Sequence, residues 1–331
     1  MRRAFAEGDL AHANGHSYFP PRNLVNLTNH LMSVLVVGTT ALDSIKTPKA
    51  ENPRLLGGSA SHAAVAASFF APTKLLGVVG GDFPAKYLKL YQKHGICLKG
   101  LEHVRDGQTF HWSGEYEVNM NNRRTLNTVL GVIEHWSPKL PGDYETTPYV
   151  LLANIAPPIQ HAVIDQLERP KFIIADTMDL WMNIMLPELL RLLKRVDAFV
   201  LNESEAHQLT KEDNVFAAMK KIHKLGPKYI IIKKGSHGAV LSGPNGFFIA
   251  PAYPLRKVVD PTGAGDSFVG GMIGYLASAK GDLEKNLRRA IIHGTVTASF
   301  CCEGFGVVAT TRATRQSIDL RVKELEALAR F

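Results

Sequence analysis

Residues 258–271 decide the fold, and they read V-V-D-P-T-G-A-G-D-S-F-V-G-G. Two β-branched residues end a predicted strand, a Pro/Thr/Gly turn follows, and a helix of small residues then begins. Free N–H groups at a helix start attract anions, and glycines let a phosphate approach them closely. A carboxylate at Asp266 suits the helix dipole but repels a phosphate. We therefore interpret Asp266 as facing the group that attacks the phosphate. The alternative is a tight turn with a favourably placed acid.

Composition restricts the classes of protein to consider. The chain has 331 residues, of which 45% are hydrophobic and 21% charged. This length suits one large α/β domain or two smaller ones, and no apolar run approaches the roughly 18 residues of a membrane helix. The formal net charge is +8, but the basic residues are scattered. We expect no nucleic-acid or membrane partner, and a small polyanion such as a nucleotide fits the charge.

The three cysteines are Cys97, Cys301 and Cys302. Their number is odd and no C-x-x-C spacing occurs, which argues against a disulfide framework or a zinc site. This pattern is typical of a reducing compartment, so we expect a cytoplasmic location.

Residues 1–31 differ from the rest of the chain. They are rich in Asn, His and Pro, and no apolar core follows the two arginines near the start, so we do not expect a secretory signal. Met32 directly precedes the first convincing strand. We predict that 1–31 is an N-terminal extension, disordered or packed on the surface.

Short apolar runs alternate with helical patterns along the chain, which predicts a mostly parallel sheet covered by helices. Several of these runs are followed by a polar residue, and ligands gather at that edge of open α/β sheets. The predicted strands are Ser33–Gly38, Leu75–Val79, Tyr149–Ala153, Phe172–Ala175, Ala198–Leu201 and Tyr229–Lys233. The polar residues beyond their ends include Asp43, Asn154, Asp176 and Asn202.

A different pattern interrupts the alternation between Gln108 and Val129. Thr109–Val118 alternates with period two, Asn119–Asn122 predicts a turn, and 123–129 returns as a second strand. This hairpin would project from the main sheet. Its aromatic residues Phe110 and Trp112 could cover a site or could only pack the hairpin down.

Two other segments open helices. Gly57-Gly58 precedes a small-residue helix that runs to Phe70. Asn202-Glu203-Ser204-Glu205 follows a strand, and its first and last residues lie together on one helical turn. The Asn/Glu pair predicts either a capping box or a site that orders a metal ion through water.

These segments together resemble the ribokinase/PfkB carbohydrate kinase family. Asp260–Ile273 resembles its C-terminal signature, 202–205 its N-x-x-E motif, and Gly57-Gly58 its N-terminal signature. The resemblance covers about 33–315. It implies a ribokinase-like three-layer α/β/α fold with a mostly parallel central sheet, over 32–331, and a small β-hairpin lid contributed by about 43–56 and 105–130.

The resemblance also implies an ATP-dependent kinase with Mg²⁺, and with K⁺ as a further cation in some members. Asp266 would be the general base, while the amides of Gly263, Ala264 and Gly265 would face the developing negative charge. The other implied contacts are Asn202 and Glu205 with the metal; Lys234, Ser236, Gly238 and His293 with the nucleotide; Asp260 and Thr262 with the cation or nucleotide; and Asp43, Gly57, Gly58 and His62 with the acceptor.

The acceptor is left open by one departure from the family pattern. His62 stands where the family's signature has an asparagine that holds substrate hydroxyls. Phe110, Trp112 and Trp181 could supply an aromatic wall for a base, which favours a nucleoside such as adenosine. The alternatives are a free sugar, a sugar phosphate, or a non-catalytic sensor of nucleotides or sugars.

Two further expectations concern other classes and assembly. A dinucleotide-dependent oxidoreductase is not favoured, because 38–43 lacks the G-x-G-x-x-G pattern. We expect a monomer, or a homodimer formed through the lid.

Overall fold

The computed structural model describes residues 32–118, 120 and 123–330. The predicted extension at 1–31 lies outside these residues, and so does most of the predicted Asn119–Asn122 turn. No helix of the described part is long and apolar enough to cross a membrane.

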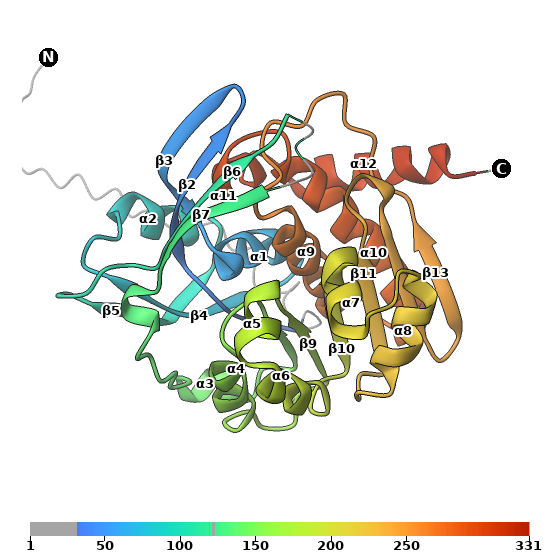
Figure 1. Ribbon diagram of the computed structural model, residues 1–331, viewed down its shortest axis with the longest axis horizontal. Helices are drawn as coiled ribbons and strands as arrows, with labels where there is room; N and C mark the ends of the chain where they lie inside the picture. Colours follow the sequence, from blue (N-terminus) through green and yellow to red (C-terminus); the bar gives the residue numbers. More distant parts are fainter. Residues whose placement is uncertain (1–31, 119, 121–122, 331) are drawn as a thin grey trace, which may run out of the picture. The chain divides into compact units, whose positions relative to one another are not determined.

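One large sheet forms the centre of the fold (Figure 1). Its order is β13-β12-β11-β10-β9-β8-β1-β4-β5. Every neighbouring pair from β5 to β11 is parallel, and β12 and β13 are antiparallel. The strands are β1 (Val34–Val37), β4 (Thr73–Gly80), β5 (Cys97–Val104), β8 (Tyr149–Leu152), β9 (Phe172–Asp176), β10 (Ala198–Asn202), β11 (Tyr229–Lys233), β12 (Ala239–Gly243) and β13 (Gly246–Ala250). The predicted mostly parallel α/β fold is confirmed.

Helices cover both faces of this sheet because successive strand side chains point to opposite sides. In β1, Val34 and Val36 join the core beneath α1, α2, α9 and α10, whereas Leu35 and Val37 join the core beneath α3 to α8. The helices are α1 (Ser59–Ser68), α2 (Ala85–Lys93), α3 (Gly142–Glu145), α4 (Pro157–Ile164), α5 (Asp179–Ile184), α6 (Leu186–Leu193), α7 (Glu203–Thr210), α8 (Val215–His223), α9 (Ala264–Ser278), α10 (Leu283–Cys301), α11 (Gly306–Thr310) and α12 (Arg315–Leu328).

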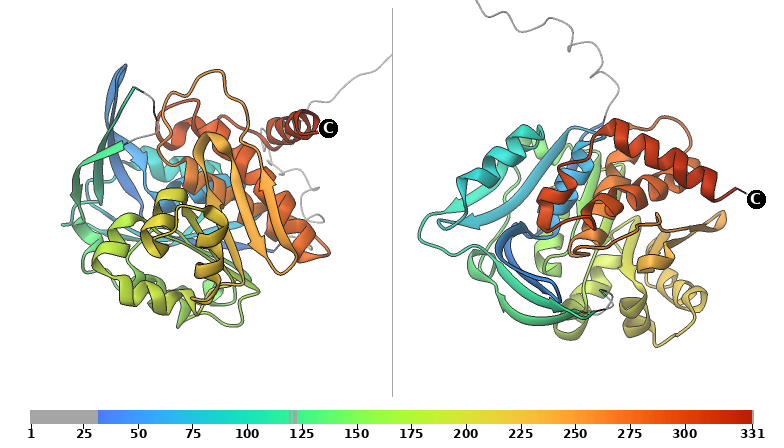
Figure 2. Two further views of the ribbon diagram at one scale, coloured as in Figure 1. Left: turned by 45° about the vertical axis from the view of Figure 1, so that its right-hand side comes forward. Right: turned by 90° about the horizontal axis from the view of Figure 1, so that it is seen from above.

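The C-terminal helix α12, drawn in red in Figure 2, packs against α10. Ile318, Val322 and Leu325 of α12 form a separate apolar cluster with Val296 and Phe300 of α10. Single-turn 3₁₀ helices occur at Gly131–Ile133 and Gly235–His237.

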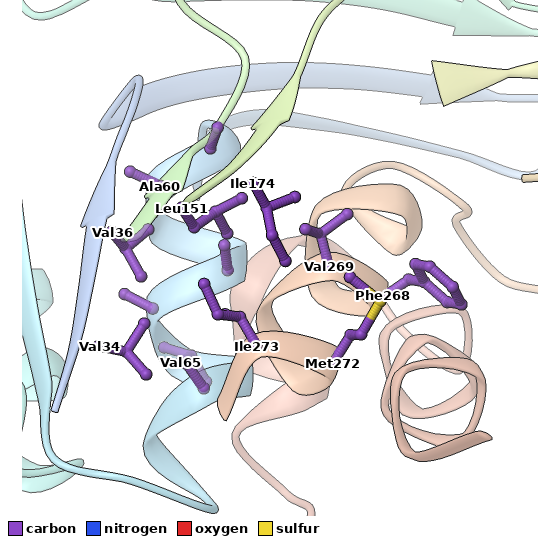
Figure 3. Packing of buried hydrophobic residues seen from close by; sticks show 14 of the residues in the cluster. Val34, Val36, Ala60, Val65, Leu151, Ile174, Phe268, Val269, Met272 and Ile273 are labelled. Carbon is purple, nitrogen blue, oxygen red and sulfur yellow. The ribbon is translucent and has the colours of Figure 1, made fainter. Parts of the chain in front are cut away.

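The small residues of α9 have a packing role. A Cβ atom at Gly270 would lie 2.2 Å from the carbonyl oxygen of Ala63, and one at Gly274 would lie 2.7 Å from that of Ala67. Helices α1 and α9 therefore approach each other at a distance that larger residues would not allow. Figure 3 shows the buried hydrophobic residues beside this contact, and Ile273 of α9 lies among them, next to α1.

A second, smaller sheet has the order β3-β2-β6-β7. Strand β2 (Ala41–Thr47) pairs with β3 (Ala50–Gly57) in antiparallel fashion and with β6 (His111–Tyr116) in parallel fashion, and β6 pairs with β7 (Arg123–Val129). The predicted period-two pattern is confirmed in β6, where Trp112 is buried and its neighbours in sequence are half-buried.

Candidate active site

The start of α9 is shaped by the turn before it. Gly263 has φ +77°, a conformation that residues with a Cβ rarely adopt. The buried Asp260 holds the turn, because its carboxylate accepts hydrogen bonds from the N–H of Thr262 (2.9 Å) and of Gly306 (3.4 Å). Asp260 is fully buried, so in this structure its position is a supporting one.

This turn separates two cavities. Gly263 and Asp266 line a small cavity of about 110 Å³. Ala264 and Gly265 line a larger one of about 590 Å³. The first turn of α9 is therefore a wall with one cavity on each side.

Two buried polar side chains face the small cavity. Asp43 Oδ2 accepts a hydrogen bond from the Gly58 N–H (3.3 Å), while Asp43 Oδ1 and His62 Nε2 have no partner among the described residues. Burial raises the pKa of Asp43 to about 7 and lowers that of His62 to about 4. Gly57 lies against the Asp43 carboxylate, since a Cβ there would be 1.9 Å from Oδ2. Unpaired buried polar atoms are costly, so these two are suited to pair with a bound ligand.

Aromatic residues form other walls of the small cavity. Phe110, Trp112 and Trp181, all named from the sequence, line it. The indole N–H of Trp181 donates to Asn154 Oδ1 (2.8 Å), which fixes that ring. Trp112 also belongs to the apolar cluster under the small sheet, so it packs the hairpin as well as facing the cavity.

Arg123 also lines the small cavity, and the sequence analysis did not select it. It comes from β7, and its guanidinium lies 5.5 Å from the centre of the Trp112 ring. Its charge lowers the pKa values of Asp43 and Asp266, although burial dominates both. In the sequence it is only one of a basic pair. Arg123 is exposed, and it reaches the rim of the cavity because β6 pairs with β7.

The large cavity contains part of the predicted nucleotide site. Ser236 and Gly238 line it, together with Tyr253 and Phe268. Lys234 is not among the residues that line this cavity, and its ammonium pairs with Glu203 (3.1 Å). The neighbouring Lys233 lines the cavity in its place. Of the two adjacent lysines, Lys233 is the one that faces this cavity, and a nucleotide contact of Lys234 stays a prediction.

His293 lies apart from the lining of the large cavity. Its ring stacks on Tyr275 with centroids 3.9 Å apart, and it lies edge-on to Phe70, away from the cavity lining. The residues of α10 that do line the large cavity are Thr295, Ala298, Ser299 and Cys302. Their spacing of three and four places them on one helical face, and a residue two positions earlier points elsewhere.

The predicted set of three amides is corrected at Ala264. Its N–H donates to the carbonyl oxygen of Pro261 (3.1 Å), closing the turn. That amide is therefore occupied within the chain, whereas the prediction had it facing an anion. Gly263 and Gly265 remain the candidates from this segment.

A charged cluster lies next to the same helix start. The ammonium of Lys233 is 2.9 Å from Asp176 Oδ2, and Glu205 and Asp266 lie near enough to raise its pKa. Burial of the ammonium opposes that rise, but the carboxylates outweigh it. Burial raises the pKa values of Asp176 and Asp266, and raises that of Glu205 to about 7.

Asn202 and Glu205 form the capping box that the sequence allowed. Asn202 Oδ1 accepts from the Glu205 N–H (2.8 Å), and Glu205 Oε2 accepts from the Asn202 N–H (2.7 Å). Among the described residues, no group of three or more His, Cys, Asp or Glu side chains is placed to hold a metal ion directly. A carboxylate can still act on Mg²⁺ through the waters that this ion keeps, and Glu205 is the carboxylate that the motif offers for this. The capping box and a metal role are compatible, since the cap engages Oε2 of Glu205.

The α/β fold has one cavity on each side of the helix start at Gly263–Asp266. Residues 34–314 match the pfkB family carbohydrate kinase, and the chain belongs to this family. It is an ATP-dependent phosphotransferase that acts on a hydroxyl group.

The relatives include kinases of nucleosides and of sugars. The cytidine kinase of Thermococcus kodakarensis is 27% identical over 253 residues, which cover 74% of this chain and 89% of that relative. The nucleoside kinase of Methanocaldococcus jannaschii is 25% identical over 289 residues, covering 82% of this chain and 91% of that relative. The solved ribokinase of Arabidopsis thaliana, complexed with ribose and ATP, shares the fold with a TM-score of 0.72 at 24% identity, covering 88% of this chain and 99% of that one.

Proposed function

We propose that this kinase transfers the γ-phosphoryl group of ATP to a hydroxyl of a nucleoside, with adenosine as the leading candidate. The small cavity is the observation that carries the proposal. It combines the unpartnered Asp43 Oδ1, an acceptor for sugar hydroxyls, with the aromatic walls of Phe110, Trp112 and Trp181. An ionised carboxylate accepts hydrogen bonds from a diol, and aromatic rings stack on a base. The cytidine and nucleoside kinases among the relatives support this choice.

The proposed chemistry uses the wall between the cavities. Asp266 faces the acceptor side and takes the proton from the attacking hydroxyl. The helix start at Gly263 and Gly265 lies where negative charge develops as the phosphoryl group moves. We also propose that the small sheet acts as a lid. Trp112 and Arg123 of this sheet line the cavity, and so does Phe110, which directly precedes β6.

Mg²⁺, when bound, would neutralise negative charge on the phosphates. We propose that Asn202 and Glu205 order this ion. A Glu205→Ala enzyme should need ~10-fold or more Mg²⁺ for half-maximal rate, as is typical when an outer ligand of a metal is removed. Steady-state rates across a Mg²⁺ titration measure this.

The matched control is Ser317→Ala, which removes the capping box of α12. Both variants lose a helix cap, but only the first should change the Mg²⁺ requirement. An unchanged titration for Glu205→Ala would leave the capping box as its only role.

An acceptor panel tests the nucleoside proposal. Adenosine, inosine and cytidine are compared with ribose, fructose and fructose 6-phosphate in an ATP-consumption assay. Stacking contributes ~1–3 kcal/mol per base, so the best nucleoside should exceed ribose by ~10-fold or more in kcat/KM. Turnover confined to free or phosphorylated sugars would reject the nucleoside and keep the kinase.

A sugar phosphate is the second candidate, and Arg123 is the observation that favours it. A guanidinium at the edge of the small cavity could pair with a phosphate already on the acceptor. The fructose 6-phosphate arm of the panel measures this alternative directly.

Three further assignments complete the proposal. We propose a monovalent cation such as K⁺ near Asp260 and Thr262, and a cytoplasmic location, which the three free cysteines support. For assembly we retain a monomer or a homodimer through the small sheet. Strand β7 is the edge at which a second copy would pair, because 123–128 is exposed. Light scattering during gel filtration separates the two states.

A further inference from the structure

Lys233 occupies an unusual position for a lysine. It ends β11, where it pairs with Asn202 of β10, so it stands at the carboxyl ends of the parallel strands and lines the large cavity. Its side chain is 18% exposed, and its ammonium bonds both oxygens of Asp176, at 3.2 Å and 2.9 Å. A lysine is seldom so buried unless it is paired.

The ammonium also lies against the first turn of α9. A Cβ atom added to Gly265 would be 3.1 Å from Lys233 Nζ, so the cation and the helix start face the same space in the large cavity. The Ala264 amide is engaged by Pro261, which removes one donor from this helix start. Lys233 supplies a charged donor beside the two that remain.

We propose that Lys233 is a catalytic residue whose ammonium binds the γ-phosphoryl group of ATP, and that Asp176 is the positioning residue that holds it. The proposal rests on the kinase function above but not on the nucleoside. In the transfer, the acceptor oxygen forms a bond to Pγ, its proton passes to Asp266, and the bond from Pγ to the bridging oxygen breaks with its electron pair remaining on ADP. Lys233 stabilises the charge on the phosphoryl oxygens while this happens.

The arrangement of the two cavities is the reason for placing the γ-phosphoryl group beside Lys233. The nucleotide side of the wall includes Gly265 and Lys233, and the acceptor side includes Asp266. The phosphoryl group that moves between the ligands must lie near this wall. Lys233 is close enough to Asp266 and Glu205 to feel both charges, which places it beside the base and the proposed metal residues.

Nucleotide binding tests the contact without an acceptor. Calorimetry with ADP and with AMP-PNP, each with Mg²⁺, compares wild type with Lys233→Met. Loss of a charge-assisted hydrogen bond should weaken AMP-PNP by ~10-fold or more while ADP changes little. Equal effects on both nucleotides would overturn the γ contact. A wild-type protein that binds neither nucleotide would overturn the kinase function as well.

Kinetics test the catalytic role with the best acceptor of the panel. Lys233→Met should lower kcat by ~10²-fold or more with little change in the KM of the acceptor. Lys221→Met is the matched control. It removes a lysine of α8 that also pairs with a carboxylate, that of Glu212, and it should keep wild-type kcat.

The double variant Lys233→Met/Asp176→Asn covers the case in which Lys233→Met fails to fold. It leaves no unpaired carboxylate at position 176. If the ion pair between Lys233 and Asp176 had only a structural role, kcat would therefore recover in this variant. We expect a folded protein with kcat still ~10²-fold or more below wild type. Near-wild-type kcat in the double variant would overturn the proposal.

Discussion

Asp266→Asn is expected to lower kcat by at least ~10²-fold while leaving the affinity for ATP nearly unchanged, because general-base catalysis typically contributes ~10²–10⁴-fold. Asparagine keeps the shape of the side chain but cannot take the proton from the attacking hydroxyl. Steady-state kinetics with varied ATP and varied acceptor separate the two effects. Burial raises the pKa of Asp266, so the acidic limb of the wild-type rate profile should lie above the usual range of an aspartate.

Asp213→Asn serves as the control for this variant. Asp213 is exposed, it pairs with His207 near the end of α7, and it lines neither cavity. It should keep wild-type kcat and the same acidic limb. If Asp266→Asn retained more than a tenth of the wild-type kcat, Asp266 could not be the base.

Gly263→Ala is expected to lower both stability and activity. The residue has φ +77°, and the left-handed conformation costs roughly 1–2 kcal/mol for a residue with a Cβ. The new Cβ would also lie 2.3 Å from three atoms of the His62 ring. Either the ring or the helix start must move, and a shift of about 1 Å at a catalytic site can cost ~10²-fold in rate. Thermal unfolding and kcat/KM measure the two effects.

Gly281→Ala separates backbone strain from crowding. Gly281 has φ +92°, but no atom lies within 4 Å of the position of its Cβ. It should lose similar stability and keep wild-type kcat/KM. Wild-type kcat/KM in Gly263→Ala would show that His62 and the helix start are not held against each other as the structure indicates.

The sequence predicted the central strands well because they are buried on both faces. Ala198–Leu201 and Tyr229–Lys233 are continuous apolar runs, and the structure has β10 and β11 there. Strand β5 (Cys97–Val104) was not predicted. It is the edge of the large sheet, and most of its residues are exposed or half-buried, so its sequence lacks an apolar run.

The sequence predicts those parts of the candidate site whose residues lie together in one short motif. Asp266 and Gly263 lie on the same turn, so their positions follow from local sequence. Lys233 and Arg123 were missed because their direction depends on how separate strands pair. A resemblance predicts the helix that carries His293 but not the direction of each side chain about the helix axis, and in the structure Thr295, Ala298 and Ser299 face the cavity.

The pairing of β2 with β6 has a consequence for how the protein folds. Leu42 and His111 are register partners although 69 residues separate them, and the next pair is Asp43 with Trp112. Contacts this distant in sequence carry a high entropic cost of chain closure, so we expect them to form after the locally connected β/α units. The acceptor side depends on this pairing, so it acquires its native structure only once two segments distant in the sequence have met. A bound acceptor would stabilise that late step, because a ligand that binds only the native state favours it by mass action.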